Sequence, residues 1–127
     1  MVYTPKHFAP HEFACNCGCG GGIDDMDQTF LVQLDKLRRL CGFPIILSSA
    51  YRCPEYNNRI SGTGYDGPHT TGKAVDIRVS GHRAHTVLEV AMSLDFKGIG
   101  ISQKGNHGSR FIHIDNTKDL RPWVWSY

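Results

Sequence analysis

The segment His69-Thr-Thr-Gly-Lys-Ala-Val-Asp-Ile77 joins a turn to a strand and carries two side chains that can bind a metal. Lys73 to Val79 alternates between polar and apolar residues, which predicts a half-buried strand with Asp76 on the face opposite the core. Gly72 allows the backbone to turn before this strand. We therefore expect His69 in the loop and Asp76 on the strand to point toward the same place.

A second strand, predicted at Phe111 to Asp115, has the same pattern, with Ile112 and Ile114 on one face and His113 on the other. Two imidazoles and one carboxylate, with a fourth position left open, form a ligand set typical of catalytic zinc. A lone histidine or aspartate of this kind is usually only solvated, so the combination carries the argument. His69, Asp76 and His113 are the expected Zn²⁺ ligands, although manganese or cobalt could occupy such a set.

The other expected elements place these two strands in a small α+β domain. Apolar residues recur at helical spacing before Gly42, which predicts a helix capped by Asp24 or Asp25, and a second main helix is expected at Arg83 to Leu94. The remaining predictions are strands at Phe43–Ser49 and Gly98–Ser102 and a short helix from Cys53 to Asn58. The expected fold is a mixed domain with a central antiparallel sheet and two main helices. It comprises one domain over residues 1–127, with a Cys/Gly-rich N-terminal arm at 1–22.

Composition excludes several classes of function. The 127 residues are 40% hydrophobic and 20% charged, which is ordinary for a globular domain. A net charge of +2 without dense Lys/Arg clusters argues against nucleic acid as a partner. Met1 to Pro10 lacks the pattern of a signal peptide, and no apolar run has membrane length. The expectation is a monomer that does not insert into membranes and is cytoplasmic when made.

Five cysteines form an odd set, so they cannot all pair within one chain. Three of them alternate in Cys15-Asn-Cys-Gly-Cys19, unlike the C-x-x-C spacing of a typical structural zinc site. The other two are Cys41 and Cys53. Three states remain open: reduced or partly paired structural cysteines, one disulfide, or a second metal site.

Four blocks of sequence resemble the zinc D-Ala-D-Ala carboxypeptidases and L-alanyl-D-glutamate endopeptidases, which share a fold with the hedgehog signalling domain. The blocks occur in the order of that family and cover most of the chain. They are Ser48-Ser-Ala-Tyr-Arg-Cys-Pro-Glu-Tyr-Asn-Asn-Arg-Ile60, His69–Ile77, Phe96-Lys-Gly-Ile-Gly-Ile-Ser102 and Phe111-Ile-His-Ile-Asp-Asn116. The opening, from His7 to Gly20, is similar to that of small phage-type members, which implies an endolysin.

The resemblance implies a peptidase that hydrolyses peptide bonds in the stem peptides of peptidoglycan, as a carboxypeptidase or an endopeptidase. It makes His69, Asp76 and His113 the zinc ligands. It also places Arg52 beside the metal, where a guanidinium can hold a substrate carboxylate or stabilise an oxyanion. Ser48 and Tyr51, delivered by the same strand end, are expected to help bind substrate. The protein would act on the cell wall after release, most simply during phage or prophage lysis.

Two positions depart from the pattern of that family. Gly67 stands where many relatives have Ser or Thr, two residues before the first zinc histidine. Arg110 stands where a well-known arrangement has an acid, three residues before the last one, and arginine cannot accept a proton at neutral pH. Asp115 is the best substitute, either as general base or as a partner of a ligand. His107 is the reserve candidate for proton transfer.

The missing acid keeps two alternatives open. The first is a non-catalytic zinc-containing module that binds cell wall, and the second is a phage structural component.

The aromatic residues that alternate at the end of the chain are expected to pack over the sheet or to form a wall of the cleft; they are Trp123, Trp125 and Tyr127. The remaining histidines are expected at the surface; they are His7, His11, His82 and His85.

Overall fold

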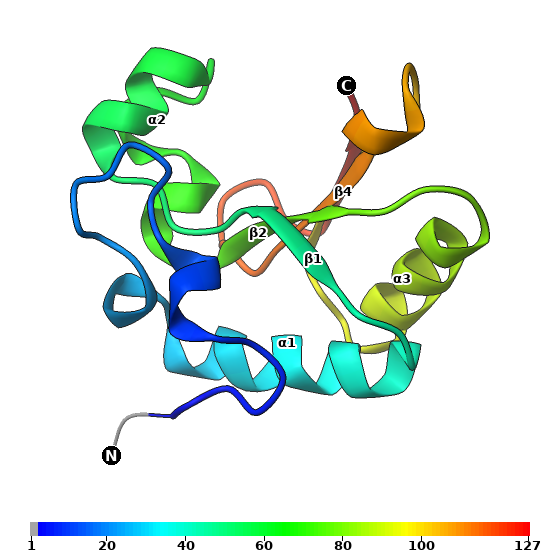
Figure 1. The fold of residues 1–127 in the computed structure, drawn as a ribbon. Coiled ribbons are helices and arrows are strands. Elements are labelled where there is room, and N and C mark those ends of the chain that lie inside the picture. Colours follow the sequence, from blue (N-terminus) through cyan, green and yellow to red (C-terminus); the bar gives the residue numbers. More distant parts are fainter. Residues whose placement is uncertain (1–2) are drawn as a thin grey trace.

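Five strands form one sheet, in the order β1-β2-β4-β3-β5, in the computed structural model, which describes residues 3–127 (Figure 1). The strands are β1 (Ile46–Ser49), β2 (Ala74–Arg78), β3 (Gly98–Ser102), β4 (Phe111–Asp115) and β5 (Trp123–Ser126). The first four pair antiparallel, whereas β5 pairs parallel to β3. The chain reverses direction after β4, but β3 already occupies the neighbouring edge, so β5 adds beyond it. The α+β class is confirmed, and the sheet is mixed rather than wholly antiparallel.

Three helices accompany the sheet: α1 (Gln28–Cys41), α2 (Pro54–Ile60) and α3 (Gly81–Ser93). α1 and α3 lie against the same face, while α2 is at the far end of the molecule (Figure 1). The first and third are the two main helices expected from the sequence. Their buried side chains meet those of β2 and β4 in one core, which includes Phe30, Leu31, Leu34, Leu37, Val75, Ile77, Val87, Ala91, Ile112 and Ile114.

The start of α1 corrects one expectation. Its N-cap is Asp27, whose carboxylate accepts a hydrogen bond from the backbone amide of Phe30 at 2.9 Å. Asp24 and Asp25 belong instead to a separate 3-10 turn, at Ile23–Asp25. Three aspartates precede the apolar stripe, and only the one that lies a single residue before the first turn has the geometry of a cap.

The N-terminal arm packs into the domain. Phe8 and Phe13 are buried, with ring centroids 5.8 Å apart. The backbone amides of Lys6 and His7 donate hydrogen bonds to the carboxylate of Asp35 on α1, at 2.7 and 3.1 Å. The arm therefore contributes Phe8 and Phe13 to the core. Met1 and Val2 lie outside the described residues. Both are expected from the sequence to belong to the single domain and to the segment without a signal-peptide pattern.

Strand register places one row of residues across the polar face of all five strands. Asp76 is opposite His113, which is in turn opposite Gly100. Ser49 and Trp125 extend this row on β1 and β5. The face away from α1 and α3 therefore brings two candidate ligands together at its centre. Within residues 3–127, no helix has the length and apolar character needed to cross a membrane.

Candidate metal centre

Three buried side chains converge on the polar face of the sheet. Nε2 of His69 lies 3.3 Å from Oδ1 of Asp76, and Nδ1 of His113 lies 3.0 Å from the same oxygen. Asp76 and His113 face each other from β2 and β4, whereas His69 enters from a 3-10 turn at Pro68–Thr71. The structure thus brings together the three residues that the sequence selected.

The spacing of these atoms fits a zinc ion. Zn²⁺ binds imidazole nitrogen and carboxylate oxygen at about 2.0–2.1 Å, which puts neighbouring corners of a tetrahedron about 3.3 Å apart. The two histidine nitrogens lie at nearly this spacing from Oδ1 of Asp76, and all three donor atoms lie within 4.8 Å of one another. Three protein donors also leave one corner of the tetrahedron open, as in catalytic rather than structural zinc sites.

The second nitrogen of each imidazole is held by the protein. Nδ1 of His69 donates to the carbonyl oxygen of Ala50 at 2.7 Å. Nε2 of His113 donates to Oδ2 of Asp115, also at 2.7 Å. Such partners fix the ring orientation and leave the other nitrogen unprotonated toward a metal. His69 would therefore ligate through Nε2 and His113 through Nδ1.

The charges within the centre follow from burial and hydrogen bonding. Burial raises the pKa of Asp76, but its close contacts with the imidazoles of His113 and His69 outweigh burial and hold this pKa well below its usual range. Burial lowers the pKa of His69, so that this ring is neutral. Burial also opposes the charged form of His113, but hydrogen bonds to Asp115 and Asp76 prevail and raise its pKa. Asp76 is thus ionised, and a metal would compete with a proton on His113.

Arg52 binds the oxygen of Asp76 that the histidines do not approach. Its Nη2 lies 3.2 Å from Oδ2 of Asp76, in a pair that is largely buried. Two further bonds hold the guanidinium, from Nε to Oγ of Ser49 at 2.9 Å and from Nη1 to Oδ1 of Asn57 at 3.1 Å. Arg52 therefore turns Oδ1 of Asp76 toward the candidate metal position.

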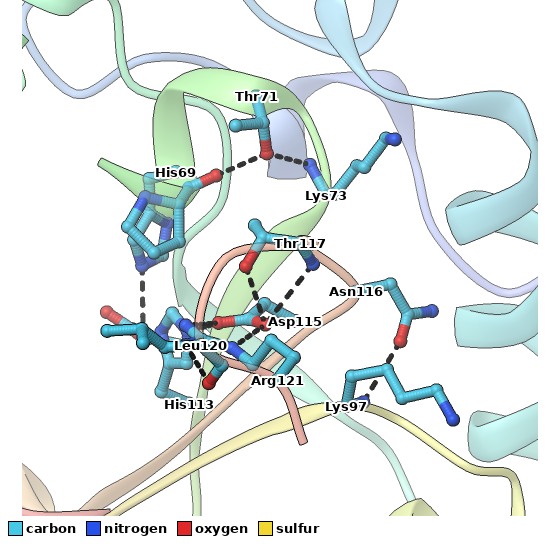
Figure 2. A network of polar contacts seen from close by, with 12 residues as sticks. His69, Thr71, Lys73, Lys97, His113, Asp115, Asn116, Thr117, Leu120 and Arg121 are labelled. Atoms are coloured by element: carbon cyan, nitrogen blue, oxygen red, sulfur yellow. Dashed lines mark hydrogen bonds and ion pairs between the residues drawn. The ribbon is translucent and has the colours of Figure 1, made fainter. Parts of the chain in front are cut away.

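Asp115 lies behind His113, away from that position. It is fully buried, and both of its oxygens accept hydrogen bonds from Arg121 at 2.9 Å (Figure 2). Burial raises its pKa, but bonds from His113 and Arg121 outweigh this and keep the pKa below its usual range. The opposite position on β3 must be Gly98, because a Cβ there would lie 2.2 Å from Oδ1 of Asp115. Asp115 is thus a carboxylate enclosed by its partners.

An open cavity of about 410 Å³ lies over the centre. The ring of Trp125 is 5.1 Å from that of His113, and the guanidinium of Arg121 lies 5.0 Å above Trp125. The lining residues are Arg52, Ile60, Ser61, Thr63, Pro68, His69, Asp76, Phe111, His113, Leu120, Arg121, Trp123, Trp125 and Tyr127. The C-terminal aromatic residues thus form a wall of the cavity, as one of the two sequence interpretations held.

Three residues expected beside the substrate do not line this cavity. Ser48 directs its hydroxyl at the backbone oxygen of Asp76, at 3.4 Å. Tyr51 packs against the arm, so closely that a Cβ at Gly21 would lie 2.6 Å from its ring. His107 is exposed and lies 3.4 Å from Oγ of Ser80. Strand alternation and the turn after β1 aim Ser48 and Tyr51 away from the cavity, and His107 lies in a separate 3-10 turn, His107–Ser109.

The two departures from the expected motif also have structural explanations. A Cβ at Gly67 would lie 2.1 Å from Oγ1 of Thr63, so the hydroxyl of Thr63 already fills the space of a side chain there. Arg110 donates two hydrogen bonds to the carbonyl oxygen of Gly105 and lies outside the cavity lining. Sequence reasoning missed Arg121, because its role depends on the loop of residues 116–122, which carries no regular pattern.

A buried two-histidine, one-carboxylate centre beneath an open cavity is typical of metal-dependent hydrolases. Comparison with known families is consistent with this class, because residues 6–115 match the model of the family described as Peptidase M15. The chain belongs to the Peptidase M15 family.

Curated relatives include the peptidoglycan L,D-endopeptidase MepK of Escherichia coli strain K12, of Escherichia coli O157:H7 and of Shigella flexneri. Each is 32% identical to this chain over 107 residues, which cover 80% of this chain and 56% of the relative. The chain therefore spans little more than half the length of these relatives. No solved structure matches the chain significantly.

Proposed function

We propose that the chain is a zinc-dependent peptidase that hydrolyses a peptide bond in the stem peptides of bacterial peptidoglycan. The observation that carries this proposal is the convergence of His69, Asp76 and His113 beneath an open cavity. Membership of the Peptidase M15 family and the similarity to MepK support the substrate class. Zinc would supply a Lewis acid for the scissile carbonyl and would lower the pKa of a water molecule.

The protein's own residues would prepare this chemistry. Arg52 and Asp115 fix Asp76 and His113 from behind, so that the centre is preformed. The guanidinium of Arg52 also lines the cavity, where its positive charge would stabilise an oxyanion. The aromatic wall formed by Trp123, Trp125 and Tyr127 would hold the peptide and limit the access of bulk water.

The two roles considered for Asp115 can be weighed by geometry. A general base must reach the proton that it abstracts, directly or through one water. Asp115 is instead enclosed by His113 and Arg121 and does not line the cavity. We therefore assign it a positioning role, in which it raises the basicity of His113 and fixes the orientation of the ring.

The charge pairing in the cavity favours an endopeptidase over a carboxypeptidase. A carboxypeptidase needs a cation free to bind the terminal carboxylate of its substrate. The two arginines among the described residues that line the cavity are already paired, with Asp76 and Asp115, so neither offers the full unpaired charge that a terminal carboxylate needs. The cavity is open and has an aromatic wall, which suits a peptide that continues through the site. This inference agrees with the L,D-endopeptidase named in the relatives.

Digestion of purified peptidoglycan, followed by mass spectrometry of the fragments, tests the proposal. An endopeptidase would divide cross-linked stem peptides into two parts, each with a new terminus. A carboxypeptidase would release only single terminal residues. The His113→Ala variant should lose the activity together with the zinc of this centre. Zinc binding without any cleavage by the wild-type chain would overturn the proposal.

One observation favours a second candidate, a zinc-containing module that binds cell wall without cutting it. Among the described residues that line the cavity, Asp76 is the sole carboxylate, and it is a candidate ligand. No separate carboxylate therefore faces the cavity as a general base. Retention of the chain on insoluble peptidoglycan, without release of fragments, would favour this candidate. The expected phage or prophage origin and monomeric state stay predictions.

A further inference from the structure

Four of the five cysteines gather at one place outside the cavity. Cys15, Cys17 and Cys19 come from the N-terminal arm, and Cys53 comes from the turn before α2, more than thirty residues later. The Sγ atom of Cys17 lies 3.4 Å from that of Cys15 and 3.6 Å from that of Cys53. All four Sγ atoms lie within 4.8 Å of one another. None of these cysteines forms a disulfide.

This spacing fits a tetrahedral thiolate site. Zinc binds cysteine sulfur at about 2.3 Å, which places the sulfurs of a four-cysteine site about 3.8 Å apart. The separations of 3.4 and 3.6 Å and the upper limit of 4.8 Å bracket that value. A disulfide, by contrast, joins only two sulfurs, about 2.05 Å apart, and would leave two thiols of the four unused. Convergence of four thiols is better explained by a metal than by pairing.

The backbone of the arm folds so that the cysteines at alternate positions, Cys15, Cys17 and Cys19, all face the cluster. In a regular strand, residues i and i+2 are about 6.6 Å apart. Cysteines two residues apart in such a strand would hold their sulfurs too far apart to bind one zinc ion. Here the amide of Cys15 donates to the carbonyl of Gly21 at 2.8 Å and closes the segment into a loop. Gly18 and Gly20 adopt φ values of +80° and +92°, the left-handed region that glycine tolerates.

Backbone amides already hydrogen-bond to two of the sulfurs. The amide of Cys53 donates to Sγ of Cys15 at 3.3 Å, and that of Gly21 donates to Sγ of Cys19 at 3.4 Å. Four thiolates around one Zn²⁺ leave excess negative charge, and amide hydrogen bonds of this kind offset it. The loop therefore provides both the ligands and their supporting donors.

We propose that Cys15, Cys17, Cys19 and Cys53 bind a structural zinc ion, separate from the candidate catalytic centre. The ion would fasten the arm to the turn that follows β1. Cys53 directly follows Arg52, whose amide donates to the carbonyl of His69 at 3.2 Å and whose guanidinium holds Asp76. The thiolate site thus fixes the segment that carries Arg52 into the cavity.

Zinc content of purified protein tests the proposal, with Cys41→Ser as the matched control. Cys41 is the one cysteine outside the cluster, at the end of α1. We expect two zinc ions per wild-type chain and two in Cys41→Ser. Cys53→Ser and His113→Ala should each retain one. If the candidate catalytic centre did not bind zinc, the thiolate zinc would still be measured. The proposals for the two sites can therefore be tested independently.

X-ray absorption at the zinc edge of His113→Ala provides a second test, which needs no cysteine variant to fold. The remaining zinc should show sulfur neighbours at about 2.3 Å. A shell of only nitrogen and oxygen neighbours would overturn the proposal. Equal zinc content in wild type and Cys53→Ser, with both proteins folded, would also overturn the proposal. An intact mass short of two hydrogens in unreduced, denatured wild type would show a disulfide instead.

Discussion

Asp76 and His113 occupy directly opposed positions on the antiparallel strands β2 and β4, and their side chains meet at 3.0 Å. Opposed residues of such a pair bring their Cβ atoms about 4.5–5.5 Å apart on the same face. Two of the three candidate ligands are therefore positioned by paired interior strands of the sheet, whereas His69 lies in a turn. A centre of this kind is expected to be preformed before any ion binds.

Asp76→Asn should remove zinc from the centre and abolish hydrolysis. The amide keeps the shape of the side chain but supplies a neutral, weaker ligand between two histidines, and it leaves Arg52 without its carboxylate. Zinc content and peptidoglycan digestion measure the two effects. Asp95→Asn is the matched control, because Asp95 is an exposed carboxylate whose ion pair, within residues 3–127, is with Lys97 alone. Full activity in Asp76→Asn would contradict the assigned centre.

Asp115→Asn should weaken zinc binding by about tenfold to a hundredfold while leaving turnover at saturating zinc within a few-fold of wild type. The physical reason is that Asp115 acts on His113 rather than on the substrate. Activity measured against buffered free zinc separates the two parameters. If Asp115 were the general base, turnover would fall by about 10²–10⁴ at every zinc concentration, and the positioning role would be wrong.

Much of the fold and two of the three candidate ligands could be predicted from sequence, because these features follow from periodicity. Alternation in β2 and β4 put Asp76 and His113 on the polar face, and the structure places them there. The turn containing Gly72 was also anticipated, and its φ is +73°. These features are local: each depends on a few neighbouring residues and on the two-residue period of a strand.

The surroundings of the centre depend on contacts that no local pattern encodes. Arg121 reaches Asp115 from an irregular loop, and Trp125 reaches His113 because β5 pairs with β3 beyond β4. Register also explains the two glycines in Gly98-Ile-Gly100, which the sequence alone presents only as part of a strand. Side chains at these positions would collide with Asp115 and with Trp125.

Gly100→Ala should destabilise the protein and weaken substrate binding. The new Cβ would lie 2.6 Å from Nε1 of Trp125, so the ring must shift from its place over His113. Overpacking of this kind costs about 1–3 kcal/mol in the free energy of unfolding. Denaturant unfolding and the KM for stem peptides provide the readouts. Gly62→Ala is the control, because a Cβ there meets nothing within 4 Å, and equal effects in both variants would contradict the explanation.

Activity at limiting zinc should fall as the pH is lowered through the raised pKa of His113. Zinc needs Nδ1 of this ring unprotonated, whereas His69 has a lowered pKa and Asp76 is already ionised. Because the pKa of His113 lies above its ordinary 6.5, the loss should begin above that pH. Raising the zinc concentration should move the midpoint to lower pH. If the pH midpoint of activity did not change with zinc concentration, the titrating group would be a catalytic group instead.

Arg52→Lys should lower kcat/KM by about tenfold to a hundredfold even though the positive charge is retained. The guanidinium makes three bonds at once, to Asp76, Ser49 and Asn57, and a single ammonium on a flexible stem cannot reproduce this fork. Oδ2 of Asp76 would then be free to turn, and the centre would lose its fixed geometry. Arg59→Lys is the matched control on α2, because Arg59 stacks on Tyr56 outside the cavity lining. If Arg52 contributed only its charge, the two lysine variants would have the same activity as wild type.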